Sequence, residues 1–198
     1  MIKRTSDIIF SLIGIVVLLP FFFLVSLFIL LDSKGGIFFK QVRVGRGNKD
    51  FYLYKFRTMR SDSEKRGQLT IGSRDNRITR VGYYLRKLKL DELPQLINVL
   101  KGDMSLVGPR PEVRKYVNLY TDEQLKVLSV RPGITDYASI KYFSESDLLA
   151  KSSNPEKTYI EEIMPEKLKI NLEYVNKNGF FADMTIVFKT LGKIIRIK

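Results

Sequence analysis

An uncharged apolar block near the N-terminus limits most strongly what this chain can fold into. Residues 8–31 read IIFSLIGIVVLLPFFFLVSLFILL and contain no charged side chain. A helix needs about 20 apolar residues to cross the hydrocarbon core of a bilayer, and this block is long enough. A signal peptide fits less well, because its apolar region is about 7–15 residues long and ends at a small-residue cleavage site. The block therefore predicts a membrane-embedded segment.

Pro20 divides this block into two halves that are each too short to span a bilayer alone. Proline removes a backbone donor and clashes with the preceding turn, so we expect a kink there. Both a bent spanning helix and a re-entrant hairpin are consistent with such a kink. Basic residues flank the block on both sides: Lys3 and Arg4 before it, and Lys34, Lys40, Arg43 and Arg46 after it. Positive residues favour the cytoplasmic face, so the charges favour a hairpin that keeps both flanks there.

Composition limits the chemistry that the chain can carry out. The formal net charge is +13, which implies an anionic partner such as nucleic acid, acidic lipid or a phosphorylated substrate. The chain has no Cys and no His, so zinc sites built from these residues and Ser-His-Asp or Cys-His catalysis are excluded. An enzyme with this composition would rely on carboxylates, Lys, Tyr or hydroxyls, and oxygen-liganded Mg²⁺ is its natural metal.

The remainder of the chain predicts a mainly helical α+β domain. Alternating apolar and polar residues indicate a β-hairpin with strands at 38–44 and 51–58 and a turn at 45–48. We expect helices from Arg77, from Asp91 to a stop at Gly102, and over 121–128, 161–176 and 184–197. Residues 102–112 read as a loop rich in turn residues. The last helix is basic and amphipathic, and we expect it to lie along a membrane surface.

Residues 89–96, KLDELPQL, contain the candidate catalytic pair Asp91 and Glu92. Asp91 is a good N-cap residue, and Pro94 would occupy the first helical turn. A helix N-terminus would keep Asp91 ionised and attract a phosphate. An ionised carboxylate can attack phosphorus, as in aspartyl-phosphate enzymes. Taken alone, however, such a pair is weak evidence, because most acidic residues at helix starts are caps and solvated surface.

Cations without an obvious structural role surround this pair in the sequence. The candidate ligands for substrate phosphate are Lys55, Arg57, Arg77, Arg80, Arg86 and Arg110. The planar guanidinium of arginine suits phosphate recognition. An ordinary solvated helix face explains Arg86 equally well. Arg110 is harder to explain in that way, because Pro109 and Pro111 hold its backbone in a defined shape.

The order of these motifs resembles the bacterial sugar transferases, the monotopic phosphoglycosyl transferases. The matching segments are KRTSD at 3–7, the proline-broken block, FFKQVRVG at 38–45, YKFRTM at 54–59, RITRVGYYLRKLKLDELPQLINVLKGDMSLVGPRPE at 77–112 and RPGIT at 131–135. Together they cover most of residues 1–135. The long central segment is a far more specific signal than a lone Asp-Glu pair.

The resemblance implies transfer of a phosphosugar from a UDP-sugar to polyprenyl (undecaprenyl) phosphate, with release of UMP. This would be the first membrane step of surface glycan or glycoconjugate assembly. In that reaction Asp91 would attack the β-phosphorus and carry an aspartyl phosphosugar. Glu92 would support Mg²⁺ or proton transfer, and both carboxylates are expected as ligands of the Mg²⁺ cofactor.

The resemblance also implies an architecture and a location. Residues 1–34 would form a re-entrant helix-break-helix with its turn near Pro20, and residues 35–198 a cytoplasmic catalytic domain. The expected location is the cytoplasmic face of the bacterial inner (cytoplasmic) membrane. Membrane lipids are expected partners and nucleic acid is not, and a homodimer is possible. Residues 136–143 depart from the family pattern and lack its usual Arg, which affects the expected sugar or nucleotide contacts after Thr135.

Two other functions fit the composition. The positive charge is consistent with a nucleic-acid-binding protein, although the apolar block argues against one and no recognition motif is present. A non-catalytic basic membrane adaptor would use the C-terminal helix only to bind lipid. An adaptor should tolerate Asp91→Asn, whereas the enzyme should not.

Overall fold

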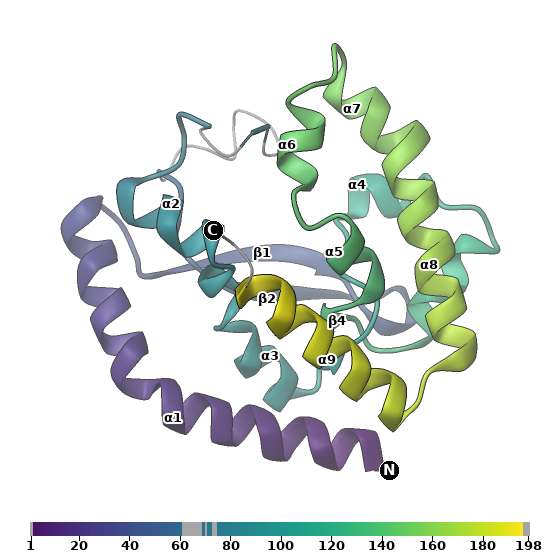
Figure 1. The fold of residues 1–198 in the computed structure, drawn as a ribbon, viewed down its shortest axis with the longest axis horizontal. Coiled ribbons are helices and arrows are strands. Elements are labelled where there is room, and N and C mark those ends of the chain that lie inside the picture. The colour runs from purple at the N-terminus through teal and green to yellow at the C-terminus, as the bar shows by residue number, and fades with distance from the viewer. Residues whose placement is uncertain (1, 61–68, 70, 73–74, 196–198) are drawn as a thin grey trace.

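The computed structural model of the chain describes residues 2–60, 69, 71–72 and 75–195. This part of the chain is a mainly helical α+β structure with two small sheets, as the sequence predicts (Figure 1). The elements in chain order are α1 (Ile2–Asp32), β1 (Phe38–Val44), η1 (Arg46–Asn48), β2 (Asp50–Phe56), α2 (Arg80–Lys87), η3 (Leu90–Glu92), α3 (Gln95–Lys101), β3 (Ser105–Val107), α4 (Arg114–Val117), η4 (Gln124–Ser129), β4 (Gly133–Thr135), α5 (Tyr137–Lys141), α6 (Glu145–Leu149), α7 (Pro155–Thr158), η5 (Tyr159–Ile163), α8 (Met164–Lys177) and α9 (Phe180–Ile195).

The apolar block forms α1, a single helix that contains Pro20. The expected helix-break-helix is therefore one continuous helix, which changes direction part-way along its length (Figure 1). Proline removes one backbone hydrogen bond and bends a helix, but the turns on either side can remain helical. The helix is long and apolar enough to cross a membrane, with a mean hydropathy of 3.0 in its most apolar window and only 17% of that window buried.

Both ends of α1 are attached to the same globular body. Near its start, the buried carboxylate of Asp7 accepts hydrogen bonds from Ser105 Oγ and from the Leu106 N–H, each at 3.0 Å. At its end, Asp32 Oδ2 accepts a hydrogen bond of 2.8 Å from the Val81 N–H, at the start of α2. The helix consequently lies along the domain and is anchored there by polar groups at both ends.

The β-hairpin is confirmed. Strands β1 and β2 pair antiparallel, with Phe38 opposite Phe56 and Val44 opposite Asp50. Gly47, with φ of 67°, makes the turn between them possible, because a left-handed backbone suits glycine. Phe56 is 1% exposed and packs with Val25 and Ile29 of α1, so the hairpin also supports that helix.

A second sheet has one of its two strands inside residues 102–112, which the sequence predicts to be a loop. Strand β3 pairs parallel with β4, with Ser105 opposite Gly133 and Val107 opposite Thr135. A Cβ atom added to Gly133 would lie 2.0 Å from the Gly108 amide nitrogen, so the strands can approach this closely only with glycine there. The description as a loop is wrong because such a short strand is specified by a distant partner rather than by its own pattern.

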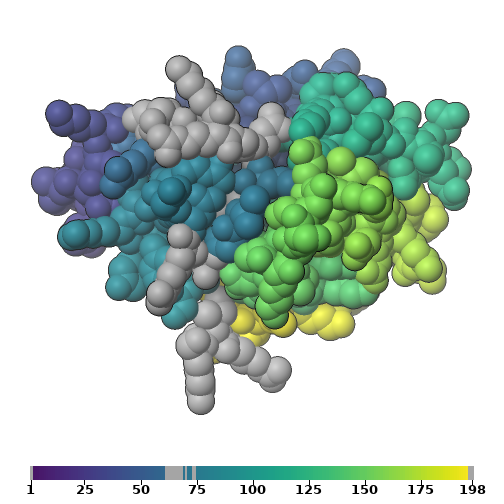
Figure 2. Space-filling model, turned by 90° about the horizontal axis from the view of Figure 1, so that it is seen from above, coloured from purple at the N-terminus to yellow at the C-terminus, as the bar shows by residue number. Residues whose placement is uncertain are grey.

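The helices after residue 113 form a separate core around Tyr116, Tyr159 and Leu168. Figure 2 shows this later part of the chain, in green, on one side of the molecule, with the purple to blue-teal earlier part on the other. The predicted helices over 161–176 and 184–197 are present as α8 and α9, although the last residues of the second prediction lie outside the described part. The helix predicted over 121–128 is the 3-10 segment η4.

Candidate active site

A cavity of about 500 Å³ lies between the acidic turn η3, the loop that carries Arg110, and helices α8 and α9. Its charged wall includes Arg86, Lys89, Glu92 and Arg110. Its apolar wall includes Val187, Leu191 and Ile194 of α9, together with Leu93 and Leu96 next to the acidic pair. The cavity therefore joins a polar centre to an apolar surface on one of the helices expected at the membrane.

Asp91 and Glu92 lie in the 3-10 turn η3 rather than at the start of an α-helix. The Glu92 N–H donates to the Lys89 carbonyl at 3.3 Å, and Lys89 adopts a left-handed backbone with φ of 57°. Helix α3 begins only at Gln95, with Pro94 as its N-cap residue. The predicted capping role of Asp91 is therefore wrong, because the left-handed turn at Lys89 places the acidic pair before the helix.

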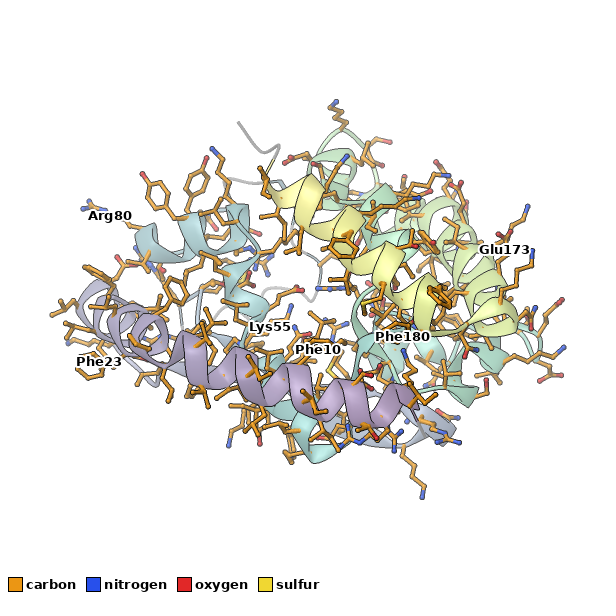
Figure 3. All side chains as sticks on the ribbon, turned by 60° about the horizontal axis from the view of Figure 1, so that its bottom comes forward. Phe10, Phe23, Lys55, Arg80, Glu173 and Phe180 are labelled. Atoms are coloured by element: carbon orange, nitrogen blue, oxygen red, sulfur yellow. The ribbon has the colours of Figure 1, made fainter. Side chains whose placement is uncertain are left out.

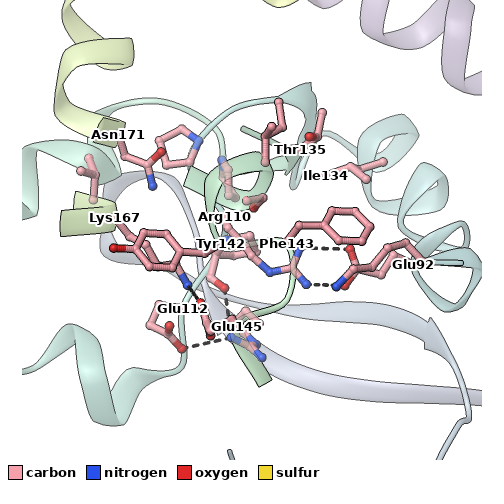
Figure 4. A pocket seen from close by; sticks show the side chains of 18 of the residues that line it. Glu92, Arg110, Glu112, Ile134, Thr135, Tyr142, Phe143, Glu145, Lys167 and Asn171 are labelled. Atoms are coloured by element: carbon pink, nitrogen blue, oxygen red, sulfur yellow. Dashed lines mark hydrogen bonds and ion pairs between the residues drawn. The ribbon is translucent and has the colours of Figure 1, made fainter. Parts of the chain in front are cut away.

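Glu92 is the centre of an ion-pair network (Figure 4). Arg110 Nη1 donates to Glu92 Oε2 at 3.0 Å, and Arg110 Nη2 donates to Oε1. Lys55 Nζ, from β2, donates to the same Oε1 at 3.1 Å. Burial opposes ionisation of Glu92, but the charges of Arg110 and Lys55 outweigh it and hold the pKa of Glu92 well below its ordinary range. Glu92 is thus an ionised residue whose oxygens are both in use.

Asp91 has a different environment, although it is adjacent in sequence. Asp91 is 5% exposed, and its carboxylate accepts no hydrogen bond from the described residues. Burial, followed by the negative charge of Glu92, raises the pKa of Asp91, and the positive charges of Lys55 and Arg86 act against this rise. The expected helix N-terminus is absent at Asp91, and desolvation, which opposes ionisation, is the largest influence on its pKa. Glu92, and not Asp91, lines the cavity.

Arg110 is held in place by Asp136, which the sequence analysis does not identify. The Arg110 N–H donates to Asp136 Oδ2 at 2.7 Å, and the other carboxylate oxygen accepts from the Ser139 N–H at the start of α5. Asp136 is fully buried. The β3–β4 pairing brings the two motifs together, so Asp136 fixes the loop that carries Arg110. An Asp immediately before a helical segment was the available signal for this role.

The structure brings three of the six candidate phosphate ligands together, namely Lys55, Arg86 and Arg110. Arg57 instead donates to the Ser33 carbonyl at 2.6 Å and so binds the C-terminal end of α1. Arg77 pairs with Asp75 at 2.6 Å. Arg80 projects outward from α2, whereas Lys55 lies towards the middle of the molecule (Figure 3).

The donor chemistry of the site fits a magnesium ion. Mg²⁺ usually binds one or two protein carboxylates together with waters and substrate phosphates. The described residues contain no cluster of three or more acidic side chains that would hold a metal without a substrate. Asp91 accepts no hydrogen bond from the described residues, while the oxygens of Glu92 are bound by Arg110 and Lys55. Asp91 would therefore be the residue to hold an ion that neutralises charge on a bound substrate phosphate.

Helix α9 lines the cavity with one face and exposes large apolar side chains on another. Phe181 is 86% exposed, Phe188 69% and Ile195 81%. Exposed apolar side chains also run along α1, where Phe23 projects away from the body of the molecule (Figure 3). Extended apolar surface of this kind marks a protein-binding or membrane-binding face.

Comparison with known proteins gives one family and several relatives. The family model described as "Bacterial sugar transferase" matches residues 1–197. The chain is 39% identical over 198 residues to the UDP-N-acetylgalactosamine-undecaprenyl-phosphate N-acetylgalactosaminephosphotransferase of Aeromonas hydrophila, a match covering 98% of this chain and 44% of that protein. It is 34% identical over 198 residues to the UDP-glucose:undecaprenyl-phosphate glucose-1-phosphate transferase of Escherichia coli (strain K12), covering 98% and 40%.

A shorter relative matches over nearly its full length. The exopolysaccharide production protein PSS of Rhizobium leguminosarum bv. phaseoli is 38% identical over 197 residues, covering 96% of this chain and 93% of that protein. This chain thus spans less than half of the Aeromonas and Escherichia proteins and almost all of the Rhizobium protein.

Proposed function

The chain belongs to the bacterial sugar transferase family, and we propose that it transfers a phosphosugar from a UDP-sugar to undecaprenyl phosphate, releasing UMP. The names of the Aeromonas and Escherichia relatives contain both substrate classes. One observation in the structure carries the proposal. The buried carboxylate of Asp91, which accepts no hydrogen bond from the described residues, lies beside a Glu92 whose charge is balanced by Lys55 and Arg110. This arrangement provides a nucleophile and a cationic centre at one place.

Asp91 is the better nucleophile of the two carboxylates. The oxygens of Glu92 are engaged by Arg110 and Lys55, and its low pKa makes them weakly basic. Asp91 is desolvated and has no such partners, so its oxygens keep their basicity once ionised. In the first half-reaction an Asp91 oxygen forms a bond to the β-phosphorus. The bond from that phosphorus to the bridging oxygen breaks, UMP leaves with the bonding electron pair, and an aspartyl phosphosugar remains.

The second half-reaction regenerates the enzyme. A phosphate oxygen of undecaprenyl phosphate attacks the phosphorus of the aspartyl phosphosugar, and the bond to Asp91 breaks to restore the carboxylate. The products are undecaprenyl diphosphosugar and free enzyme, so atoms and charges balance over the two steps. The apolar cavity wall of α9, including Leu191 and Ile194, offers a surface for the first part of the lipid chain.

Cations around the acidic pair stabilise the charge that develops on the phosphates. Arginine has five N–H donors, and Glu92 uses only two sites of Arg110, so others remain for a substrate phosphate. Glu92 therefore orients Arg110 and Lys55 rather than consuming their charge. When bound, Mg²⁺ would neutralise the diphosphate and favour departure of UMP.

The attachment of α1 at both ends supports a re-entrant membrane helix. Its polar contacts at Asp7 and Asp32 join the same domain, and Lys3 pairs with Asp183 at the start of α9. A helix that spans the bilayer would have to break one set of these contacts, with its buried polar groups left unpaired. We infer that α1 enters and leaves on the cytoplasmic face of the inner membrane and that α9 lies on the same surface.

The test is single-turnover chemistry in detergent with Mg²⁺. Given only a suitable UDP-sugar from a panel, the enzyme should release about one UMP per active site and stop, the burst expected of a covalent intermediate. Addition of undecaprenyl phosphate should then restore continuous release, and mass spectrometry should find a phosphosugar on the peptide containing residues 89–96. Asp91→Asn should abolish the burst.

Other outcomes of this experiment reject specific parts of the proposal. An adduct that persists in Asp91→Asn and disappears in Glu92→Gln would show that the two carboxylates have exchanged roles. Release of UMP only when both substrates are bound, with no adduct, would exclude the covalent route. No release from any UDP-sugar would leave a non-catalytic membrane adaptor as the better description.

A further inference from the structure

Lys89 has a backbone conformation that its residue type disfavours. Its φ is 57°, and Asn48 is the only other non-glycine residue with positive φ in the part of the chain that the structure describes. Asparagine adopts the left-handed region readily, whereas lysine rarely does so. Backbone strain of this kind persists where the surrounding structure requires it, and it is concentrated at functional sites. Lys89 lies two residues before Asp91, so its conformation bears directly on the turn that carries the acidic pair.

The side chain of Lys89 lines the cavity, and an aromatic ring holds its ammonium group. Nζ lies 5.0 Å from the centroid of the Phe143 ring. Phe143 follows α5, and Figure 4 shows its ring beside the Glu92–Arg110 pair. The face of an aromatic ring attracts a cation but does not neutralise it. Phe143 therefore fixes the position of the ammonium and leaves its charge available.

Lys89 differs from other cations of the cavity wall in having no carboxylate partner. Arg110 is bound to Glu92, Arg43 to Glu112 and Lys167 to Glu145. Lys89 takes part in no ion pair with the described residues, although much of its side chain is buried. Placing a charge away from water costs free energy, and an anion that enters the cavity would remove much of that cost.

We propose that Lys89 binds a phosphate group of the substrate in this cavity, with its ammonium positioned by the left-handed turn and by Phe143. The inference rests on the proposed function, since both the UDP-sugar and undecaprenyl phosphate carry phosphate. Lys55 and Arg110 are both bound to Glu92, whereas Lys89 has no ion-pair partner among the described residues and keeps all three of its N–H donors for a phosphate. The ammonium donates to a phosphate oxygen and transfers no group itself.

Lys89→Asn separates binding from folding. Asparagine tolerates the left-handed conformation, so the variant should unfold at the same or a higher temperature than the wild type. It removes the ammonium. We therefore expect the constant for the substrate whose phosphate Lys89 binds, either the Kd of the UDP-sugar or the KM for undecaprenyl phosphate, to rise roughly ten- to hundredfold, the usual effect of losing a hydrogen bond to a charged group. Lys87→Asn is the matched control, because it makes the same charge change on the exposed last turn of α2. That variant should bind like the wild type.

The experiment uses the full chain in detergent with Mg²⁺. The Kd of UDP-glucose and of UDP-N-acetylgalactosamine is measured without lipid in an Asp91→Asn background, where the adduct does not form. The KM for undecaprenyl phosphate is measured with Asp91 intact, at saturating UDP-sugar. A weaker Kd assigns Lys89 to the nucleotide phosphates, and a raised KM alone assigns it to the lipid phosphate. In Lys89→Asn, the affected constant, Kd or KM, should also change less steeply with salt concentration than in the wild type. Lys89→Arg should recover part of the loss and Lys89→Gln none, which keeps the test valid if Lys89→Asn folds poorly.

Three results would overturn the inference in distinguishable ways. If the wild type is active and Lys89→Asn retains both constants, Lys89 binds no substrate phosphate while the proposed function stands. If Lys87→Asn weakens binding as much as Lys89→Asn, the effect is one of net charge and the assignment to Lys89 is wrong. If the wild type neither binds nor turns over any UDP-sugar, the proposed function fails, and this inference with it.

Discussion

Glu92 and Arg110 are joined by two hydrogen bonds, so that a residue of the η3 turn holds the guanidinium of a loop 18 positions further along the chain. Lys55 completes the contact from β2. Three segments thus meet at one carboxylate, which makes Glu92 important for both stability and catalysis.

Glu92→Gln should destabilise the protein at neutral pH by roughly 2–3 kcal/mol, because it leaves two partly buried cations without a counter-charge. The pKa of Glu92 is depressed in the folded state, so its contribution is present above the unfolded pKa and is lost as the pH falls through the folded pKa. The difference between variant and wild type in denaturant unfolding should therefore shrink in acid. Glu156→Gln, which breaks the exposed pair with Lys115, is the control and should change stability little.

Asp91→Asn should abolish activity and yet leave the protein as stable as the wild type, or more so, at pH 7. The pKa of Asp91 is raised in the folded state, so its favourable contribution is present below the unfolded pKa and is lost as the pH rises through the folded pKa. Ionised Asp91 then costs stability at neutral pH, and Asn removes that cost. Thermal unfolding at pH 7 and near pH 3 measures this, with a gain expected only at pH 7. A clear loss of Tm at pH 7 would contradict the assignment.

Gly133→Ala should displace the loop that carries Arg110. The added methyl group would lie 2.0 Å from the Gly108 amide nitrogen, so β3 and β4 must separate. We expect a loss of roughly 2 kcal/mol in stability and a larger relative loss in kcat, because small displacements at a reacting centre are costly. Gly192→Ala in α9 is the control. Its methyl group meets nothing within 4 Å, and alanine favours a helix, so stability should stay the same or rise.

Cysteines at Ile2 and Gly36 test the membrane topology, since the chain has no natural cysteine. In intact cells, an impermeant maleimide should label neither position if both ends of α1 are cytoplasmic, and both should react after permeabilisation. Reaction of either cysteine from the periplasm would exclude the re-entrant helix. Pro20→Leu should restore the missing hydrogen bond, straighten the helix and shift it towards a true span.

The exposed aromatic residues of α9 should contribute to membrane binding. Phe181→Ser and Phe188→Ser should each lower partitioning onto anionic vesicles roughly tenfold, given the free energy of burying a large apolar side chain. Leu119→Ser serves as the control, since Leu119 is 50% exposed and lies elsewhere in the chain. Equal losses in all three variants would show that α9 has no special contact with the lipid.

Local patterns in the sequence determined the elements that depend on a repeating period. The uninterrupted apolar run of α1 and the alternation in β1 and β2 require no distant partner to be recognised. The adjacent carboxylates Asp91 and Glu92, and the rigid Pro-Arg-Pro around Arg110, were also visible there. Each of these signals lies within a few residues of chain.

Only the tertiary structure decided which charges meet. Lys55 and Arg57 are two positions apart and look alike in sequence, yet Lys55 contacts Glu92 and Arg57 binds the end of α1, because β2 ends between them at Phe56. The same holds for Asp91 and Glu92, whose pKa values move in opposite directions. Burial opposes ionisation of both, but only Glu92 is hydrogen-bonded to Arg110 and Lys55, and these two cations come from segments far from the acidic pair in the chain. The sequence gives the type of each ionisable side chain, but its desolvation and its partners exist only once the chain has folded.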